Sequence, residues 1–233
     1  MHAAPELDTA IFREAIEALN AADLCFVIGG AFAVYRYTGV WRNTHDLDIY
    51  LERKYVPAAI ESLTQHGFRD LGEMAAGDRE WIYHASKDKV LVDLIWQSPH
   101  GLSVVDESFY TRSREGTFVE MQTRFMPPDE LILAKIYTMN QHRCDWPDVL
   151  RIARACPDDL DWELMMTKMR ENWPVLLSFI ILFDWCYPGD ACCVPVSLRE
   201  ELLRRKLESP SENPGPNRES ILDPWIYTRP ISP

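Results

Sequence analysis

The stretch FVIGGAFAVYRYTGVWRNTHDLDI (residues 26–49) decides the fold. An apolar strand ends at a Gly-Gly pair, and a second short strand then carries Asp46 and Asp48 one residue apart. Because alternate side chains of a strand share a face, we expect both carboxylates on one side and Leu47 and Ile49 in the core. Two like charges on one face repel each other unless a cation lies between them. The stretch therefore predicts a metal site.

Length and composition are typical of a globular protein. The 233 residues suffice for one large domain or two small ones, and 47% are hydrophobic and 26% charged. The longest apolar run, VLLSFIILFDWC (residues 175–186), is interrupted by Ser178 and Asp184, which favours a buried helix over a membrane span. The N-terminus lacks the pattern of a secretion signal. We therefore expect a cytoplasmic protein with no membrane segment.

The cysteines and the net charge exclude several classes of function. None of the six cysteines forms a CxxC pair, so we expect reduced, mostly buried thiols and neither a disulfide framework nor a zinc site. The net charge of −12 argues against a broad nucleic-acid surface, which needs clustered Lys and Arg. Local contact with a nucleotide or a tRNA end stays open.

Residues 1–126 alternate between strand and helix patterns. Helices are predicted at 7–22, 31–37 and 56–66, and strands at 24–28, 47–51, 81–84 and 90–96, with a hairpin-like edge at 117–126. The pattern predicts a small mixed sheet flanked by helices, in the α+β class.

A Pro-Pro pair at positions 127 and 128 marks a change in composition. Residues 127–208 predict a helical bundle, with helices at 130–142, 146–155, 162–170, 173–185 and 198–207. Tryptophans spaced as core anchors lie in these helices, at Trp146, Trp162, Trp173 and Trp185. Residues 209–233 hold six of the chain's 16 prolines and are expected to form an extended tail.

A third carboxylate strengthens the prediction of a metal site. Asp93 interrupts the apolar strand VLVDLIW, where an unpaired carboxylate would lose much solvation energy. We therefore expect it at a strand end that faces a cleft. Together with Asp46 and Asp48 it could hold two Mg²⁺ ions about 3.5–4 Å apart, an arrangement suited to in-line displacement at phosphorus. The Gly29-Gly30 turn opens a helix, and its N–H groups suit a triphosphate.

These residues resemble the DNA polymerase β-like nucleotidyltransferase superfamily, whose pattern is a strand, a Gly-Gly or Gly-Ser turn, a helix, D-x-D and a later Asp. The segments PPDELILAKIYTMNQHRCDWPDVLRI and NWPVLLSFIILFDWCYPGD are similar to those of bacterial stand-alone nucleotidyltransferase family proteins. The resemblance covers most of residues 20–205. It implies a nucleotidyltransferase fold in residues 1–126, followed by the helical domain.

The resemblance implies Mg²⁺-dependent transfer of a nucleoside monophosphate from an NTP to a hydroxyl acceptor, with release of pyrophosphate. Asp46 and Asp48 would bind one or both metal ions, and Asp93 would complete the second metal site and help to deprotonate the acceptor. Gly29 and Gly30 would hold the β- and γ-phosphates. A small molecule, a protein side chain and a tRNA 3′ end stay open as acceptors.

One residue departs from the family pattern. Ala31 stands where many relatives carry a Ser whose hydroxyl touches the phosphates. Backbone N–H groups or Thr44 would have to replace that contact. The departure favours an alternative, in which the chain is a catalytically weak or inactive module with a binding or regulatory role, similar to one half of a toxin–antitoxin pair.

Several charged residues have two interpretations. Arg42 could contact a phosphate or neutralise the nearby acidic pair. Lys135 could lie on a solvated helix face or, as in relatives, face the triphosphate. Arg143, Asp145 and Asp148 are expected to form an ion-paired joint that holds the helical region against the cleft.

Overall fold

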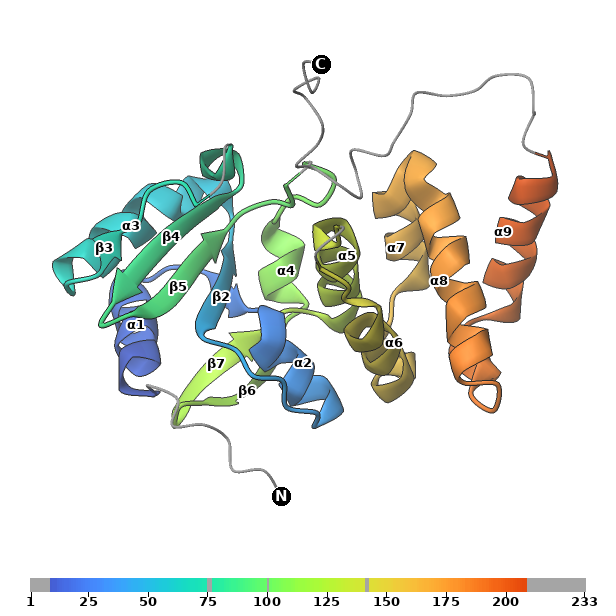
Figure 1. The fold of residues 1–233 in the computed structure, drawn as a ribbon, viewed down its shortest axis with the longest axis horizontal. Helices are drawn as coiled ribbons and strands as arrows, with labels where there is room; N and C mark the ends of the chain where they lie inside the picture. Colours follow the sequence, from blue (N-terminus) through green and yellow to red (C-terminus); the bar gives the residue numbers. More distant parts are fainter. Residues whose placement is uncertain (1–8, 75–76, 100, 141–142, 209–233) are drawn as a thin grey trace, which may run out of the picture.

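The structure is a computed structural model that describes residues 9–74, 77–99, 101–140 and 143–208 (Figure 1). The predicted tail, residues 209–233, lies outside the described residues. Within them, one mixed sheet is flanked by helices, and further helices follow it along the chain. The predicted α+β class is confirmed.

Seven strands form the sheet, in the order β3-β4-β5-β2-β1-β7-β6. Their bounds are β1 (Phe26–Ile28), β2 (Asp46–Leu51), β3 (Arg69–Asp70), β4 (Ile82–Lys87), β5 (Val90–Ile95), β6 (Arg114–Phe118) and β7 (Met121–Phe125). The pairs β2–β5 and β1–β7 are parallel, and the other neighbours are antiparallel. The two-residue strand β3 was not predicted, and the predicted edge at 117–126 is the β6–β7 hairpin.

Helices lie before, between and after the strands. Their bounds are α1 (Thr9–Ala21), α2 (Gly30–Thr38), α3 (Val56–Gln65), α4 (Glu107–Thr111), α5 (Pro128–Thr138), α6 (Trp146–Ala155), α7 (Trp162–Met169), α8 (Trp173–Cys186) and α9 (Val196–Glu208). Short 3₁₀ turns occupy residues 53–55, 78–80, 157–159, 170–172 and 191–193. Helix α5 ends at Thr138, earlier than the predicted 142, because Met139 has extended backbone angles.

The first two helices after residue 126 pack onto α2, the helix that follows the Gly-Gly turn. Helices α5 and α6 both contact α2, and α7, α8 and α9 extend away from the sheet toward one end of the molecule (Figure 1). Among the described residues, no helix is both long enough and apolar enough to span a membrane.

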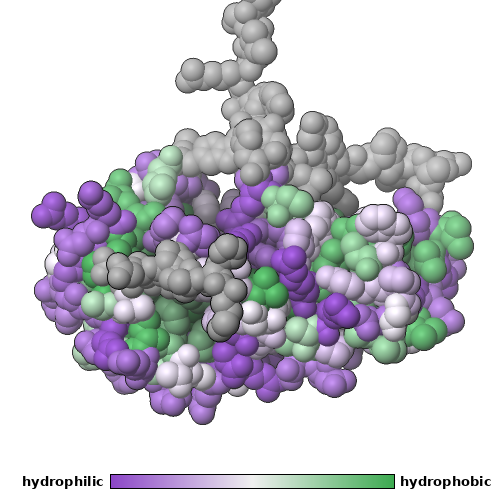
Figure 2. All heavy atoms as spheres, turned by 60° about the horizontal axis from the view of Figure 1, so that its bottom comes forward, coloured by the Kyte–Doolittle hydropathy of each residue, from purple (hydrophilic) through white to green (hydrophobic). Residues whose placement is uncertain are grey.

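The core confirms the predicted alternation of strand β2. Leu47, Ile49 and Leu51 are buried, whereas the residues between them are only half-buried on the opposite face. The prediction that Trp185 anchors the core is wrong, since 78% of its surface is exposed on α8. Apolar side chains are exposed at this end of the molecule (Figure 2), Leu207 of α9 among them.

The cysteines are all free, as predicted, but most are not buried. Only Cys156 is buried, and the other five are half-buried or exposed. The expectation of mostly buried thiols is wrong, because the cysteines after residue 126 occur at helix ends and in the segments between helices.

Candidate active site

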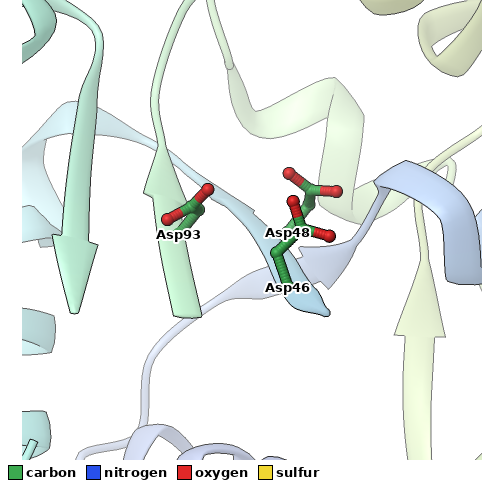
Figure 3. Close-up of side chains that lie close together, drawn as sticks. All are labelled: Asp46, Asp48 and Asp93. Carbon is green, nitrogen blue, oxygen red and sulfur yellow. The ribbon is translucent and has the colours of Figure 1, made fainter. Parts of the chain in front are cut away.

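Three carboxylates converge on the open face of the sheet. Strands β2 and β5 run parallel in a register that pairs Asp48 with Asp93, and Asp46 lies two residues before Asp48 on the same face. One oxygen of each carboxylate lies within 4.8 Å of an oxygen of the other two. Figure 3 shows the three side chains projecting from the two strands to the same side. Three oxygen donors this close could hold a divalent metal ion.

Asp93 lines the cavity, as predicted, but it lies in the middle of β5, so the prediction of a strand end is wrong. Only 8% of its surface is exposed. Its charge is balanced from the next strand, where Nδ1 of His84 lies 2.8 Å from Asp93 Oδ1. The other ring nitrogen of His84 lies 3.4 Å from Asp78 Oδ2. Asp93 therefore has the nearby donor that its burial requires.

Burial and neighbouring charges raise the pKa of two of the carboxylates, Asp48 and Asp93. Burial, together with the charges of Asp46 and Asp93, raises the pKa of Asp48 to about 7. Burial also raises the pKa of Asp93, although the hydrogen bond from His84 acts in the opposite direction. The contact with Asp93 in turn raises the pKa of His84. A bound cation would favour the ionised carboxylates, so the three residues fit a divalent metal.

The Gly-Gly turn lies against Asp48. The N–H of Gly29 donates to the backbone oxygen of Asp48 at 2.9 Å, and α2 begins at Gly30. A Cβ on Gly30 would lie 1.6 Å from Asp48 Oδ2, and one on Gly29 would lie 2.3 Å from the Tyr50 ring. Gly30 also has a φ of +54°, which favours glycine. Only glycine brings the start of a helix this close to the acidic pair.

Ala31 and Thr44 occupy different surroundings. Ala31 is the second residue of α2, and its methyl group is buried. The hydroxyl of Thr44 donates to the Asp46 carboxylate. Thr44 is therefore beside the acidic pair, where it orients one carboxylate.

A charged cluster lies beside the carboxylates, and we call its five members the basic cluster: Arg42, Lys135, Arg143, Asp145 and Asp148. Lys135 is only 3% exposed, and its Nζ lies 2.9 Å from Asp148 and 3.7 Å from Asp145. Arg42 reaches the same two carboxylates at 3.1 and 3.2 Å, and Arg143 reaches Asp145 at 2.6 Å. Three cations and two anions give the cluster a net positive charge.

The contacts within the basic cluster contradict two interpretations of its residues and confirm a third. Lys135 does not lie on a solvated helix face, because α5 is covered on nearly all sides. Arg42 neutralises Asp145 and Asp148, in place of the acidic pair on β2. The predicted ion-paired joint exists, with Arg143 bonded to Asp145 and Asp148 bonded to Lys135.

The site opens into a cavity of about 210 Å³ between the sheet, α4 and α5. The three carboxylates, Gly30, Lys135 and Arg143 share this cavity with residues that sequence reasoning missed, among them His84, Trp81, Gln97, Ser103 and Phe109. The sequence contains evidence that places His84 beside Asp93. The polar turn SKDK joins β4 to β5, and counting outward from the pair Lys87–Val90 places His84 opposite Asp93.

Comparison with solved structures finds a similar fold at low sequence identity. A solution structure of the antibiotic-resistance factor ANT(2'')-Ia is 17% identical, covers 72% of this chain and 94% of its own, and has a TM-score of 0.50. A crystal structure of ANT(2'')-Ia with adenylyl-2''-tobramycin is 16% identical and covers 69% and 93%, with a TM-score of 0.49. The lincomycin-bound lincosamide antibiotic adenylyltransferase LnuA is 13% identical and covers 62% and 95%, with a TM-score of 0.44.

Sequence comparison gives the family. No curated protein matches the chain. The family described as "Nucleotidyl transferase of unknown function (DUF2204)" matches residues 8–175, a span that contains the Gly-Gly turn, the three carboxylates and the basic cluster. With well over half of its length matched, the chain belongs to this family of nucleotidyl transferases.

Proposed function

We propose that the protein is a Mg²⁺-dependent nucleotidyltransferase that moves a nucleoside monophosphate from an NTP to a hydroxyl group. The observation that carries this proposal is the convergence of Asp46, Asp48 and Asp93, with oxygens within 4.8 Å of one another, beside the helix that begins at Gly30. Carboxylate oxygens are the ligands that Mg²⁺ prefers. When bound, the metal would neutralise charge on the triphosphate and polarise the reacting oxygens.

The carboxylates have separate roles in this proposal. Asp46 and Asp48 would hold the metal that accompanies the nucleotide, and Thr44 orients Asp46. Asp93 would help to hold a second metal ion and would accept the proton of the acceptor hydroxyl, while His84 holds its carboxylate in place. The acceptor oxygen then bonds to the α-phosphorus, the bond from that phosphorus to the β-phosphate bridging oxygen breaks, and pyrophosphate leaves.

The triphosphate binds at the start of α2 and near the basic cluster. The first N–H groups of a helix lack intrahelical partners and favour anions, so those that follow Gly29 and Gly30 suit the β- and γ-phosphates. Lys135 lines the same cavity as the carboxylates. Because the basic cluster has a net positive charge, it attracts the anion, with Arg42 at its exposed edge.

A second candidate function rests on Ala31. Its buried methyl group offers no hydroxyl to a phosphate. In this alternative the protein binds an NTP and transfers nothing, as a binding or regulatory module. The two candidates differ in whether label from the α-phosphate reaches an acceptor.

The deciding experiment uses labelled nucleotides. The protein is incubated with Mg²⁺, a cell lysate and each NTP labelled in turn at the α- or γ-phosphate, and the label is followed into RNA, protein and small molecules. We expect label from the α-phosphate in an acceptor and label from the γ-phosphate in pyrophosphate. Asp48→Asn should abolish the transfer, and Asp88→Asn, on the exposed β4–β5 turn, should not. Transfer of the γ-phosphate, or equal labelling with Asp48→Asn, would contradict the proposal.

A further inference from the structure

The open face of the sheet carries two adjacent rows of side chains. The registers of β4–β5 and β5–β2 place one polar row across the three strands, consisting of His84, Asp93 and Asp48. Two residues further along β5 and β2, the same registers place an apolar row, consisting of Ile82, Ile95 and Tyr50. Both rows line the cavity. The reacting carboxylates therefore border a floor of apolar side chains.

The roof over the apolar row is apolar as well. Phe109 of α4 stacks on Tyr50, with ring centroids 6.5 Å apart. Val105 precedes this helix, and Leu131 projects from α5. All three roof residues are buried, so a ligand body here would be enclosed by hydrocarbon and aromatic surface.

The charges around the cavity disfavour a cationic ligand. Among the described residues that line it, the only carboxylates are the three expected to bind metal. The other charged groups are Lys135 and Arg143, together with His84, and the remaining polar side chains are neutral, such as Gln97 and Ser103. An ammonium group would lose its hydration against apolar walls and gain no carboxylate that a metal does not already use.

We propose that the part of this cavity over the apolar row is the acceptor subsite, and that the acceptor is a small molecule without a positive charge that has an apolar ring or chain and a hydroxyl group that reaches Asp93. The inference rests on the proposed function, because it takes the convergent carboxylates as the place of transfer. The whole cavity, its carboxylate side included, has a volume of about 210 Å³, below the roughly 300–1,000 Å³ typical of drug-sized ligands, so the acceptor is small. A protein segment or an RNA end does not suit this enclosed, apolar space.

Two probes of matched shape test the charge preference. They are 2-(indol-3-yl)ethanol, which carries a hydroxyl, and 2-(indol-3-yl)ethylamine, which carries an ammonium group at neutral pH. Each is titrated into the full-length protein by saturation-transfer NMR, with and without Mg²⁺ and α,β-methylene-ATP. We expect the alcohol to bind at least about tenfold more tightly than the amine, a difference of about 1.4 kcal/mol.

Variants test the location of the subsite. Ile95→Trp fills the cavity from the floor, and Ser103→Phe fills it from another lining position. Val104→Phe is the matched control, since Val104 is the exposed neighbour of Ser103 and does not line this cavity. Ile95→Trp and Ser103→Phe should weaken the alcohol at least about tenfold, and Val104→Phe should not. Thermal unfolding shows which variants are folded, and either filling variant suffices for the test.

The outcomes separate this inference from the proposed function. The inference is overturned if the alcohol does not bind, if the amine binds as tightly, or if a folded filling variant binds the alcohol like the wild type. Binding of Mg²⁺ and α,β-methylene-ATP, measured by calorimetry on the same samples, reports on the nucleotide site alone. Failure of every NTP to bind in the presence of Mg²⁺ contradicts the proposed function, whereas failure of alcohol binding alone contradicts only the acceptor class.

Discussion

Nδ1 of His84 lies 2.8 Å from Oδ1 of Asp93, directly across the β4–β5 ladder. An ionised carboxylate can only accept hydrogen bonds, so the ring nitrogen is the donor. The other ring nitrogen faces Asp78, and this second contact fixes the orientation of the ring. His84 therefore holds in one orientation the carboxylate that is proposed to receive the acceptor proton.

Substitutions of His84 should separate this positioning role from packing. His84→Ala should lower Mg²⁺ affinity and the transfer rate about 10–100-fold, as loss of a hydrogen bond to a metal ligand usually does. His84→Asn should retain most of both, because its amide can occupy the place of Nδ1. His84→Gln, whose amide reaches toward Asp78, should behave like alanine. Equal losses in all three variants, in step with their melting temperatures, would indicate packing alone.

Gly30→Ala should leave a folded protein that has lost its metal site. The new Cβ would lie 1.6 Å from Asp48 Oδ2, so the carboxylate has to move. Gly39→Ala is a matched control, since Gly39 also has a positive φ but no atom lies within 4 Å of the new Cβ. Both variants should lose about 1–2 kcal/mol of stability from backbone strain. Only Gly30→Ala should lose Mg²⁺ affinity, measured by calorimetry, and equal Mg²⁺ binding by both variants would refute the expectation.

Mg²⁺ affinity should rise with pH up to about 7. Asp48 has a pKa raised to about 7 in the metal-free protein and must release its proton to bind the ion. Below pH 7, each unit of pH should therefore lower the apparent affinity by about tenfold per released proton. Calorimetry at pH 6, 7 and 8 in two buffers of different ionisation enthalpy measures both quantities. An affinity that is constant over this range, without proton release, would count against the site.

The same raised pKa affects the stability of the metal-free protein. Asp48 in the unfolded chain ionises near its ordinary pKa of 3.8, before the folded form does. Between about pH 4 and 7 the folded state therefore holds one proton more at Asp48 than the unfolded state does. The stability that this proton contributes falls as pH rises. Asp48→Asn should flatten this part of the stability profile, measured by denaturant unfolding in EDTA. A profile like that of the wild type would show that Asp48 ionises normally.

Lys135 combines a structural contact with a proposed contact to the triphosphate. Lys135→Met leaves Asp145 and Asp148 buried with less compensation, and it should lower the free energy of unfolding by about 3–5 kcal/mol. Lys135→Met combined with Asp148→Leu removes the closer pair and should recover most of that stability. The affinity for Mg²⁺ and ATP should stay low in the double variant. Wild-type affinity there would show that Lys135 serves the fold alone.

The sequence predicts the centre of the site well because the evidence there is local. In DLDIYL the strand alternation alone places Asp46 and Asp48 on one face, and the burial of Leu47 and Ile49 agrees. The family and the fold class also follow from the sequence, since they rest on patterns that extend over most of residues 20–205. The catalytic and nucleotide-binding roles of individual residues, and the domain boundary after residue 126, stay predictions.

The surroundings of the site depend on tertiary contacts that no local pattern reveals. Asp93 tolerates burial in mid-strand because His84 is its partner across the ladder. Lys135 is buried because the elements around α5 cover its charged face and supply Asp148. Trp185 has core-like spacing in its helix but lies on a face that nothing among the described residues covers.

The most direct test of the proposed active site is calorimetric titration of the protein with each NTP, with and without Mg²⁺. We expect at least one NTP to bind only when Mg²⁺ is present, and the double variant Asp46→Asn/Asp48→Asn to lose this binding while it stays folded. The double variant keeps the shape of the site and removes the charges that hold the ion. Nucleotide binding that is equally tight with and without Mg²⁺, or that persists in the double variant, would contradict the proposed site.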